Sequence, residues 1–263
     1  MGNEIKLFNG DCIEVMATLP DKSIDLVLCD LPYGTTACKW DSVIPFEPLW
    51  KQYNRIIKDN GAVVLFGSEP FSTKLRFSNF RNYKYDWYWI KSKPSMWQHS
   101  KNRPMSKVET VSVFSKAPMG HKSLLGEKRM KYNPQGVKSV GKKTIGNGKH
   151  GRILGARPNQ VGVEYEAMTG FPSNVLEYGN ITGKQAIHPT QKPVALLEYL
   201  IQTYTNEGET VLDNCMGSGS TGVACANTDR DFIGIELDEN YFNIAKNRIE
   251  AAYNAPRLFT ENG

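Results

Sequence analysis

The feature that most constrains the fold of this chain is a glycine-rich loop near its C-terminal end. A short apolar stretch, residues 211–213, has the character of a buried strand and leads into the loop. The loop has the spacing G-x-G-x-x-G at Gly217, Gly219 and Gly222, and a helical pattern follows it. Glycines at this spacing allow a tight turn and let the backbone approach a ligand closely. The next apolar run ends in Glu236, near the interval of about 20 residues at which an acid can bind ribose hydroxyls. The unit therefore predicts an α/β fold that binds an adenosine-containing cofactor.

The late position of this loop shows where the rest of the sheet must come from. Only 27 residues follow Glu236, and they contain one clear amphipathic helix, over about residues 239–253. The missing strands must lie upstream, and five runs have suitable patterns: Ile5–Phe8, Ile24–Cys29, Ala62–Phe66, Tyr85–Ile90 and Thr110–Phe114. With the two strands of the glycine-loop unit they make seven. A nicotinamide dehydrogenase usually carries its loop early in the chain, so the late loop disfavours that class.

A second motif, Asp30-Leu31-Pro32-Tyr33, directly follows the apolar run Ile24–Cys29. The carboxyl ends of the strands carry the ligand crevice in open α/β sheets. At such a position Asp30 can accept hydrogen bonds from an amino group, and Tyr33 can stack on a flat base. The tetrapeptide alone fits an ordinary turn equally well, because Asp and Pro are common turn residues. The glycine loop favours the ligand-binding interpretation.

Three motifs together resemble those of the DNA amino-methyltransferases, which use S-adenosylmethionine. Asp30-Leu31-Pro32-Tyr33 is similar to their catalytic D-P-P-Y motif, and residues 213–222 are similar to their cofactor loop. His188-Pro189-Thr190-Gln191-Lys192-Pro193 is similar to the H-x-T-Q-K-P segment of the beta class, and the order of the three motifs is the order of that class. The resemblance implies a doubly wound, mostly parallel, seven-stranded sheet of Rossmann-like type, circularly permuted. Leu31 departs from the motif but keeps the backbone carbonyl that this position would contribute.

The resemblance also implies an organisation of the chain and a set of site residues. It places a catalytic half at residues 1–115, a basic target-recognition insert at 116–180 and a cofactor-binding half at 181–263. Asp30 and the carbonyl of Leu31 would accept the amino hydrogens of a flipped base, Pro32 would hold the turn, and Tyr33 would stack on the base. The residues expected at the cofactor are Asp11, Asp30, His188, Thr190, Gln191, Lys192, Asp213, Gly217, Ser218, Gly219, Thr221 and Glu236. Asp at the first catalytic position favours N6 of adenine, and N4 of cytosine is the alternative.

Positive charge gathers in one segment of the chain. Residues 121–160 contain ten Lys or Arg and one acid, a net charge of +9 in a chain whose net charge is +5. The segment is rich in glycine and poor in large apolar residues, so it cannot build a core of its own. It is either a solvated loop or a segment that contacts phosphates, and the second interpretation fits an enzyme whose substrate is a base in DNA. The residues predicted to contact DNA are Trp97, Lys101, Arg103, Lys142, Lys143, Lys149 and Arg152.

Composition limits the remaining classes. The chain has no apolar run long enough for a membrane span, no signal-like N-terminus, and only scattered Cys and His, so we expect a cytoplasmic bacterial or phage protein without a metal. Double-stranded DNA is the expected partner, and the resemblance adds a homodimer and a cognate restriction enzyme. Methyltransferases of RNA or of protein glutamine are an alternative class. They normally place the glycine loop first, so the order of the motifs in this chain disfavours them. A non-enzymatic nucleic-acid-binding protein would leave both motifs unexplained.

Overall fold

The computed structural model describes residues 3–34, 41–120, 122–146, 161–181 and 191–255. The strands are β1 Ile5–Asn9, β2 Ile24–Cys29, β3 Ile57–Gly67, β4 Tyr83–Ser95, β5 Ser106–Phe114, β6 Lys138–Ile145, β7 Glu164–Thr169, β8 Val175–Tyr178, β9 Thr210–Asp213 and β10 Asp231–Glu236. The helices are α1 Cys12–Thr18, α2 Phe46–Ile56, α3 Phe71–Ser78, α4 Lys122–Leu125, α5 Val194–Tyr204, α6 Ser220–Asn227 and α7 Glu239–Asn254, with 3-10 turns η1 Trp97–His99 and η2 Gly126–Lys128.

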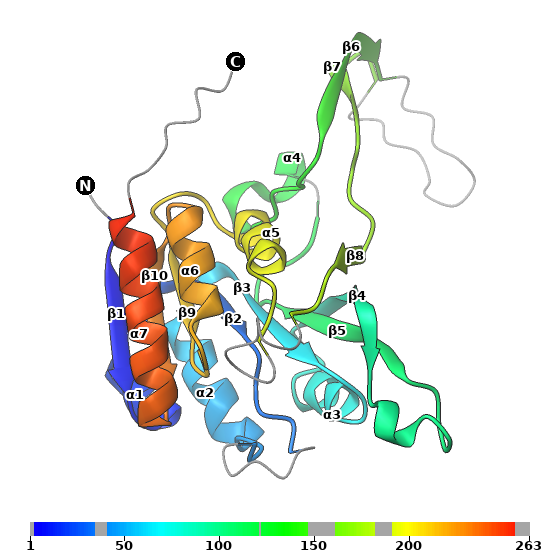
Figure 1. Ribbon diagram of the computed structural model, residues 1–263. Helices are drawn as coiled ribbons and strands as arrows, with labels where there is room; N and C mark the ends of the chain where they lie inside the picture. Colours follow the sequence, from blue (N-terminus) through cyan, green and yellow to red (C-terminus); the bar gives the residue numbers. More distant parts are fainter. Residues whose placement is uncertain (1–2, 35–40, 121, 147–160, 182–190, 256–263) are drawn as a thin grey trace. The chain divides into compact units, whose positions relative to one another are not determined.

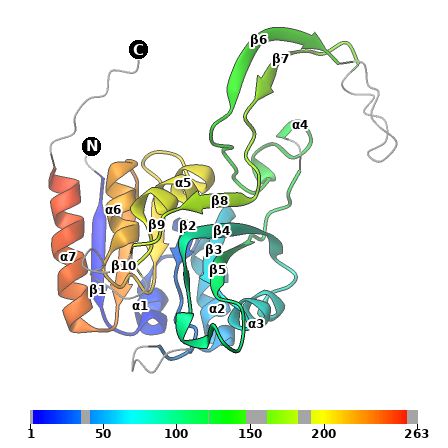
Figure 2. The same cartoon turned by 45° about the vertical axis from the view of Figure 1, so that its right-hand side comes forward.

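The main sheet has the order β1-β10-β9-β2-β3-β5-β4-β8. Its first five strands pair in parallel, while β5 runs antiparallel to both β3 and β4. All seven predicted strands are present, and the mostly parallel sheet is confirmed. The prediction of seven strands was short by one, because β8 adds to the edge in parallel with β4 (Figure 2). The circular permutation stays an inference from the resemblance.

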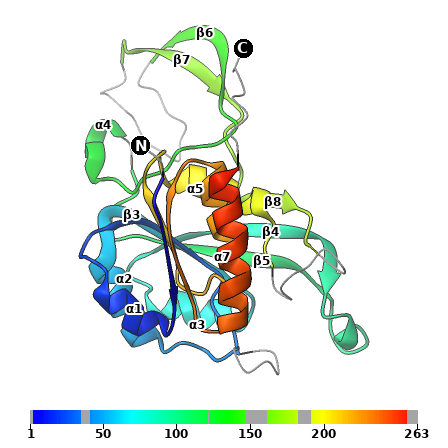
Figure 3. The same ribbon diagram turned by 60° about the vertical axis from the view of Figure 1, so that its left-hand side comes forward.

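Helices cover both faces of the sheet, as a doubly wound fold requires. Because side chains alternate along a strand, β2 sends Leu26 and Leu28 to one core and Val27 and Cys29 to the other. The first core also contains apolar residues of α5, α6 and α7, and the second contains those of α1, α2 and α3. Figure 1 shows the helices around the sheet, and Figure 3 shows α7 on one side of it and α1 and α2 on the other.

The chain divides into two compact units, residues 1–133 with 174–263, and residues 134–173. The second unit contains the antiparallel pair β6 and β7. Every residue of β6 is exposed and none of β7 is buried, as expected for a segment that cannot form a core. The predicted insert, 116–180, contains this unit, and its role in target recognition stays a prediction.

Candidate active site

The two motifs lie at the same edge of the sheet. Strands β1, β10, β9 and β2 are parallel, so the residues that follow them meet at one end. They line a cavity of about 420 Å³, within the range of small-molecule sites. Twelve of the predicted catalytic and cofactor residues line it: Asp11, Asp30, Leu31, Pro32, Tyr33, Gln191, Lys192, Asp213, Gly217, Ser218, Thr221 and Glu236. The predicted His188 and Thr190 lie outside the described residues.

Two acids fix the glycine-rich loop. Asp213 accepts hydrogen bonds from the Cys215 amide at 3.1 Å and from the Thr221 hydroxyl at 2.6 Å. Burial raises the pKa of Asp213 to about 6, although these two donors oppose the rise. The Glu236 carboxylate accepts from the Gly217 amide at 2.8 Å and from the Asp238 amide at 2.9 Å, and burial raises its pKa as well. Both oxygens of Asp213 and one oxygen of Glu236 therefore support the loop, a role that the motif alone did not reveal.

Gly219 belongs to the loop but is not among the residues that line the cavity. Its φ is +80°, and a Cβ at this position would lie 3.0 Å from the Cα and the Cβ of Ala245 on α7. Gly219 was predicted to let the backbone approach the cofactor. That role stays a prediction; in the structure the glycine is needed where the loop packs against α7.

The loop after β2 holds the Asp30 carboxylate between two donors. The Tyr33 hydroxyl donates to Oδ1 at 2.5 Å, and the Lys192 ammonium donates to Oδ2 at 2.5 Å. Burial raises the pKa of Asp30 above its ordinary value, and Lys192 opposes this rise. One face of the Tyr33 ring packs on Phe71, with centroids 4.9 Å apart, so at most the other face remains for a base. Leu31 is buried in the core beneath α1, α2 and α3, which suits the leucine that replaces the motif's proline.

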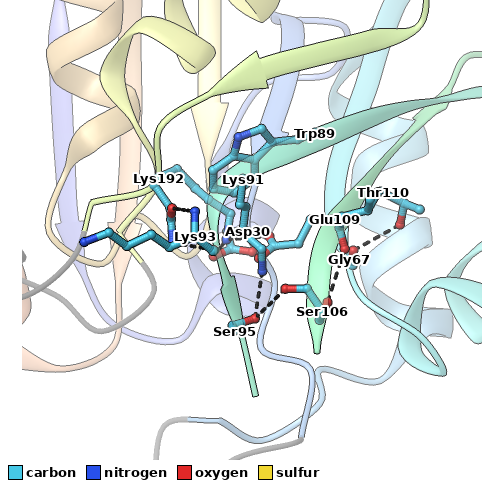
Figure 4. A network of polar contacts seen from close by, with 12 residues as sticks. Asp30, Gly67, Trp89, Lys91, Lys93, Ser95, Ser106, Glu109, Thr110 and Lys192 are labelled. Atoms are coloured by element: carbon cyan, nitrogen blue, oxygen red, sulfur yellow. Dashed lines mark hydrogen bonds and ion pairs between the residues drawn. The ribbon is translucent and has the colours of Figure 1, made fainter. Parts of the chain in front are cut away.

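Lys192 extends this arrangement into a network that sequence reasoning missed (Figure 4). Its ammonium lies 3.4 Å from Glu109 Oε2 and over the Phe66 ring, 5.1 Å from the centroid. Glu109 Oε1 in turn pairs with Lys91 at 3.1 Å. Lys192 was predicted at the cofactor; it does line the cavity, but its partners are acids. Glu109 lies directly before the predicted strand Thr110–Phe114, and this position does not identify its partner.

Comparison with known proteins agrees with this geometry. A profile of the N6/N4 DNA methylase family matches residues 24–247. The chain belongs to this family. It is 27% identical over 273 residues to the DNA adenine methyltransferase YhdJ of Escherichia coli, which covers 98% of this chain and 87% of that protein.

Two solved structures of methyltransferases are similar to this methylase. The M1.HpyAVI–SAM complex is 26% identical with a TM-score of 0.60, and the match covers 93% of this chain and 98% of the other. The PvuII DNA methyltransferase, described as cytosine-N4-specific, is 18% identical with a TM-score of 0.65, and the match covers 97% and 93%. The PvuII enzyme shows that this fold also serves a cytosine-N4 enzyme.

The residues of the methylase predicted to contact DNA are on the surface wherever the structure describes them. Trp97 is 71% exposed in the turn η1 between β4 and β5, and Lys101 and Arg103 follow it, also exposed. Lys142 and Lys143 are exposed on β6, and Lys143 pairs with Glu164 at 3.4 Å. Lys149 and Arg152 lie outside the described residues. Their role in DNA binding stays a prediction.

Two kinds of structural feature are absent from the part of the methylase that the structure describes. Within it, no group of His, Cys, Asp or Glu is arranged to hold a metal ion. No helix among these residues is long and apolar enough to cross a bilayer.

Proposed function

We propose that this DNA methylase transfers the methyl group of S-adenosylmethionine to N6 of an adenine flipped out of duplex DNA. One observation carries the proposal: the Asp30 loop and the glycine-rich loop, far apart in the chain, line the same cavity. A carboxylate that can hold an amino group then lies beside a cofactor site. Methyl transfer to an exocyclic nitrogen needs this combination, because the base must be brought against the methyl donor.

The residues of the cavity suit this cofactor. Glu236 ends β10, where an acid can accept from ribose hydroxyls, and each of its oxygens has a lone pair left after its contact with one backbone amide. The hydroxyl of Ser220, on the cavity wall, is buried without a hydrogen-bond partner among the described residues, and a polar ligand group would satisfy it. Asp11 caps α1 through the amides of Ile13 and Glu14 and also lines the cavity. The resemblance places Asp11 near the adenine ring.

The chemistry follows from the Asp30 loop. When bound, S-adenosylmethionine supplies an electrophilic methyl group on a sulfonium. The Asp30 carboxylate and the Leu31 carbonyl accept the two amino hydrogens and favour a nitrogen whose lone pair is available for attack. The bound cofactor would give its methyl carbon to the nitrogen and keep the carbon–sulfur electron pair on sulfur. The nitrogen would then lose one proton, and Asp30, which accepts an amino hydrogen, would take it. No covalent bond to the enzyme is needed.

Adenine is preferred over cytosine on two grounds. The first catalytic position is Asp30, where the resemblance associates Asp with adenine N6 and Ser more often with cytosine N4. A relative that spans nearly the whole chain is described as a DNA adenine methyltransferase. The fold does not distinguish the two bases, because the PvuII enzyme shares it.

Double-stranded DNA is the proposed partner, and two parts of the surface support contact with it. Trp97, exposed among the cations Lys101 and Arg103, is a candidate wedge for the space that an extruded base leaves. The exposed lysines of β6 are candidate phosphate contacts. A homodimer and a cognate restriction enzyme are further proposals, which rest on the resemblance.

Methylation of mixed duplex DNA by the purified protein, followed by mass spectrometry of the nucleosides, tests the proposal. We expect N6-methyladenine, and its loss in Asp30→Ala while calorimetric binding of S-adenosylmethionine stays within a few-fold of wild type. N4-methylcytosine would assign the cytosine alternative. Modification of RNA or protein alone would overturn DNA as the substrate.

A further inference from the structure

The Asp30 carboxylate has donors on both of its oxygens before any base arrives, from Tyr33 and from Lys192. In the proposed reaction, positive charge develops on the nitrogen that Asp30 holds. An ammonium on the same carboxylate weakens it as an acceptor and repels this charge. The lysine therefore stabilises the free site and opposes the reaction, unless it can move.

Glu109 offers Lys192 a second position. Its Oε2 lies 3.4 Å from the lysine Nζ and is buried without a hydrogen-bond partner among the described residues. A buried acceptor without a donor is uncommon and needs an explanation. Its other oxygen is held by Lys91, which also donates to the Ser95 hydroxyl at 2.8 Å. Glu109 is therefore fixed on one side and open on the side that faces Lys192.

The surroundings make such a shift local. The side chains of Lys192 and Lys91 are 8% and 5% exposed, and those of Asp30 and Glu109 are 20% and 16% exposed, so all four charges are largely withdrawn from water. Two acids and two lysines balance, and this balance does not change when Lys192 moves from one acid to the other. The aromatic ring of Phe66 beneath the ammonium stabilises the charge in the position that the structure shows.

We propose that Lys192 pairs with Asp30 in the free methylase and moves onto Glu109 Oε2 when the amino group of the target base takes its place. Lys192 and Glu109 are then positioning residues for methyl transfer, which makes this inference dependent on the proposed function. In the free state the charge of the lysine lowers the pKa of the buried Asp30 and so favours its ionised form. In the substrate complex Glu109 holds the lysine away from the nitrogen that becomes positive.

The two partners of Asp30 have opposite effects on its titration. The groups that face it are Tyr33 on its own loop, Lys192 before α5, Glu109 on β5, Asp213 at the end of β9 and Cys29 at the end of β2. The Lys192 charge lowers the pKa of Asp30 and the Glu109 charge raises it. If ionised Asp30 is the active form, Lys192→Met must move the acidic limb of the pH–rate profile upward. Glu109→Gln must move it downward.

The experiment measures kcat and KM against pH for wild type, Lys192→Met and Glu109→Gln. We expect an upward shift of the acidic limb of ~1–3 pH units in Lys192→Met. For Glu109→Gln we expect a downward shift and a plateau kcat lower by about tenfold or more, with KM for S-adenosylmethionine unchanged. Lys192→Arg, which keeps the charge, should return the limb close to its wild-type position.

Lys131 offers a matched control, because it too lies between two acids, 3.6 Å from the buried Asp25 and paired with Glu209. Lys131→Met removes a comparable ion-pair arrangement elsewhere in the fold and should leave the limb in place. The inference would be overturned if the acidic limb moved in the same direction in Lys192→Met and Glu109→Gln. A change confined to KM for S-adenosylmethionine would also overturn it.

A readout without turnover separates this inference from the proposed function. The pKa of Asp30 is measured by carboxyl-carbon NMR on the protein without DNA, with Asp30→Asn to assign the signal. It should rise in Lys192→Met and fall in Glu109→Gln. If the pKa of Asp30 shifts in this way in a protein that methylates no DNA, the proposed function is refuted but the ion-pair arrangement is supported. An active methylase whose Asp30 titration is unchanged in both variants would refute the shift of Lys192.

Discussion

Gly219 and Gly208 provide a matched pair that tests how the glycine-rich loop is held. Both have a positive φ, +80° and +74°, so alanine at either position is strained by the left-handed backbone, at a cost of about 1–2 kcal/mol that a stiffer unfolded chain partly offsets. At Gly208 nothing lies within 4 Å of an added Cβ, whereas at Gly219 the Cβ would lie 3.0 Å from Ala245 Cα, Ala245 Cβ and Ile249 Cδ1. Overpacking adds about 1–3 kcal/mol at Gly219 alone. We expect losses in the free energy of unfolding of about 1 kcal/mol for Gly208→Ala and about 2–4 kcal/mol for Gly219→Ala.

Urea unfolding followed by circular dichroism gives both free energies, and calorimetry gives the affinity for S-adenosylmethionine. Because the added methyl at Gly219 faces α7, the folded Gly219→Ala protein should still bind the cofactor. A variant that is as stable as Gly208→Ala but no longer binds S-adenosylmethionine would refute this reasoning. It would place the glycine in the approach path of the cofactor instead.

Three further predictions concern pH, salt and base flipping. Burial raises the pKa of Asp213 from 3.8 to about 6 in the fold, so the folded state favours the protonated carboxyl. The stability that this protonated carboxyl contributes is lost as pH rises from 3.8 to about 6. Relative to Asp213→Asn, wild type should lose about 2–3 kcal/mol between these two pH values in urea titrations, and parallel curves would contradict this. Lys142→Gln should flatten the salt dependence of DNA binding by up to ~0.9 in log–log slope, and Lys143→Gln by less because Glu164 already pairs with it; equal slopes would argue against the difference. Trp97→Ala should reduce the fluorescence rise of 2-aminopurine at the target position and leave the free energy of unfolding within about 0.5 kcal/mol, and full fluorescence would remove Trp97 as a wedge.

Most of the sheet could be predicted because its signals are local. The buried strands are short apolar runs, and α5 and α7 carry a helical pattern beside a proline or an aspartate cap. The start of β3 was missed because Lys58, Asp59 and Asn60 interrupt the pattern. Strand β8 was missed for a related reason: of its four residues one is buried, and its partner β4 is far away in the sequence.

The sequence predicted that the site lies at the carboxyl ends of the parallel strands, but it did not predict which side chains pair there. Parallel strands bring Asp30, Asp213 and Glu236 together wherever the motifs follow them. The contact of Lys192 with Glu109 depends on the register of β5 against β4 and on where α5 begins, and neither is visible in one sequence. In the same way, the spacing of glycines indicates that position 219 does not tolerate a side chain. It does not show that α7 is the neighbour that excludes one.

The central claim, that Asp30 directs a methyl group onto the amino nitrogen of adenine in duplex DNA, is tested most directly by mass spectrometry of nucleosides from DNA treated with wild type and with Asp30→Ala. We expect N6-methyladenine with the wild type and none with the variant, at saturating S-adenosylmethionine that both proteins bind. N6-methyladenine at wild-type levels in the variant would contradict the account.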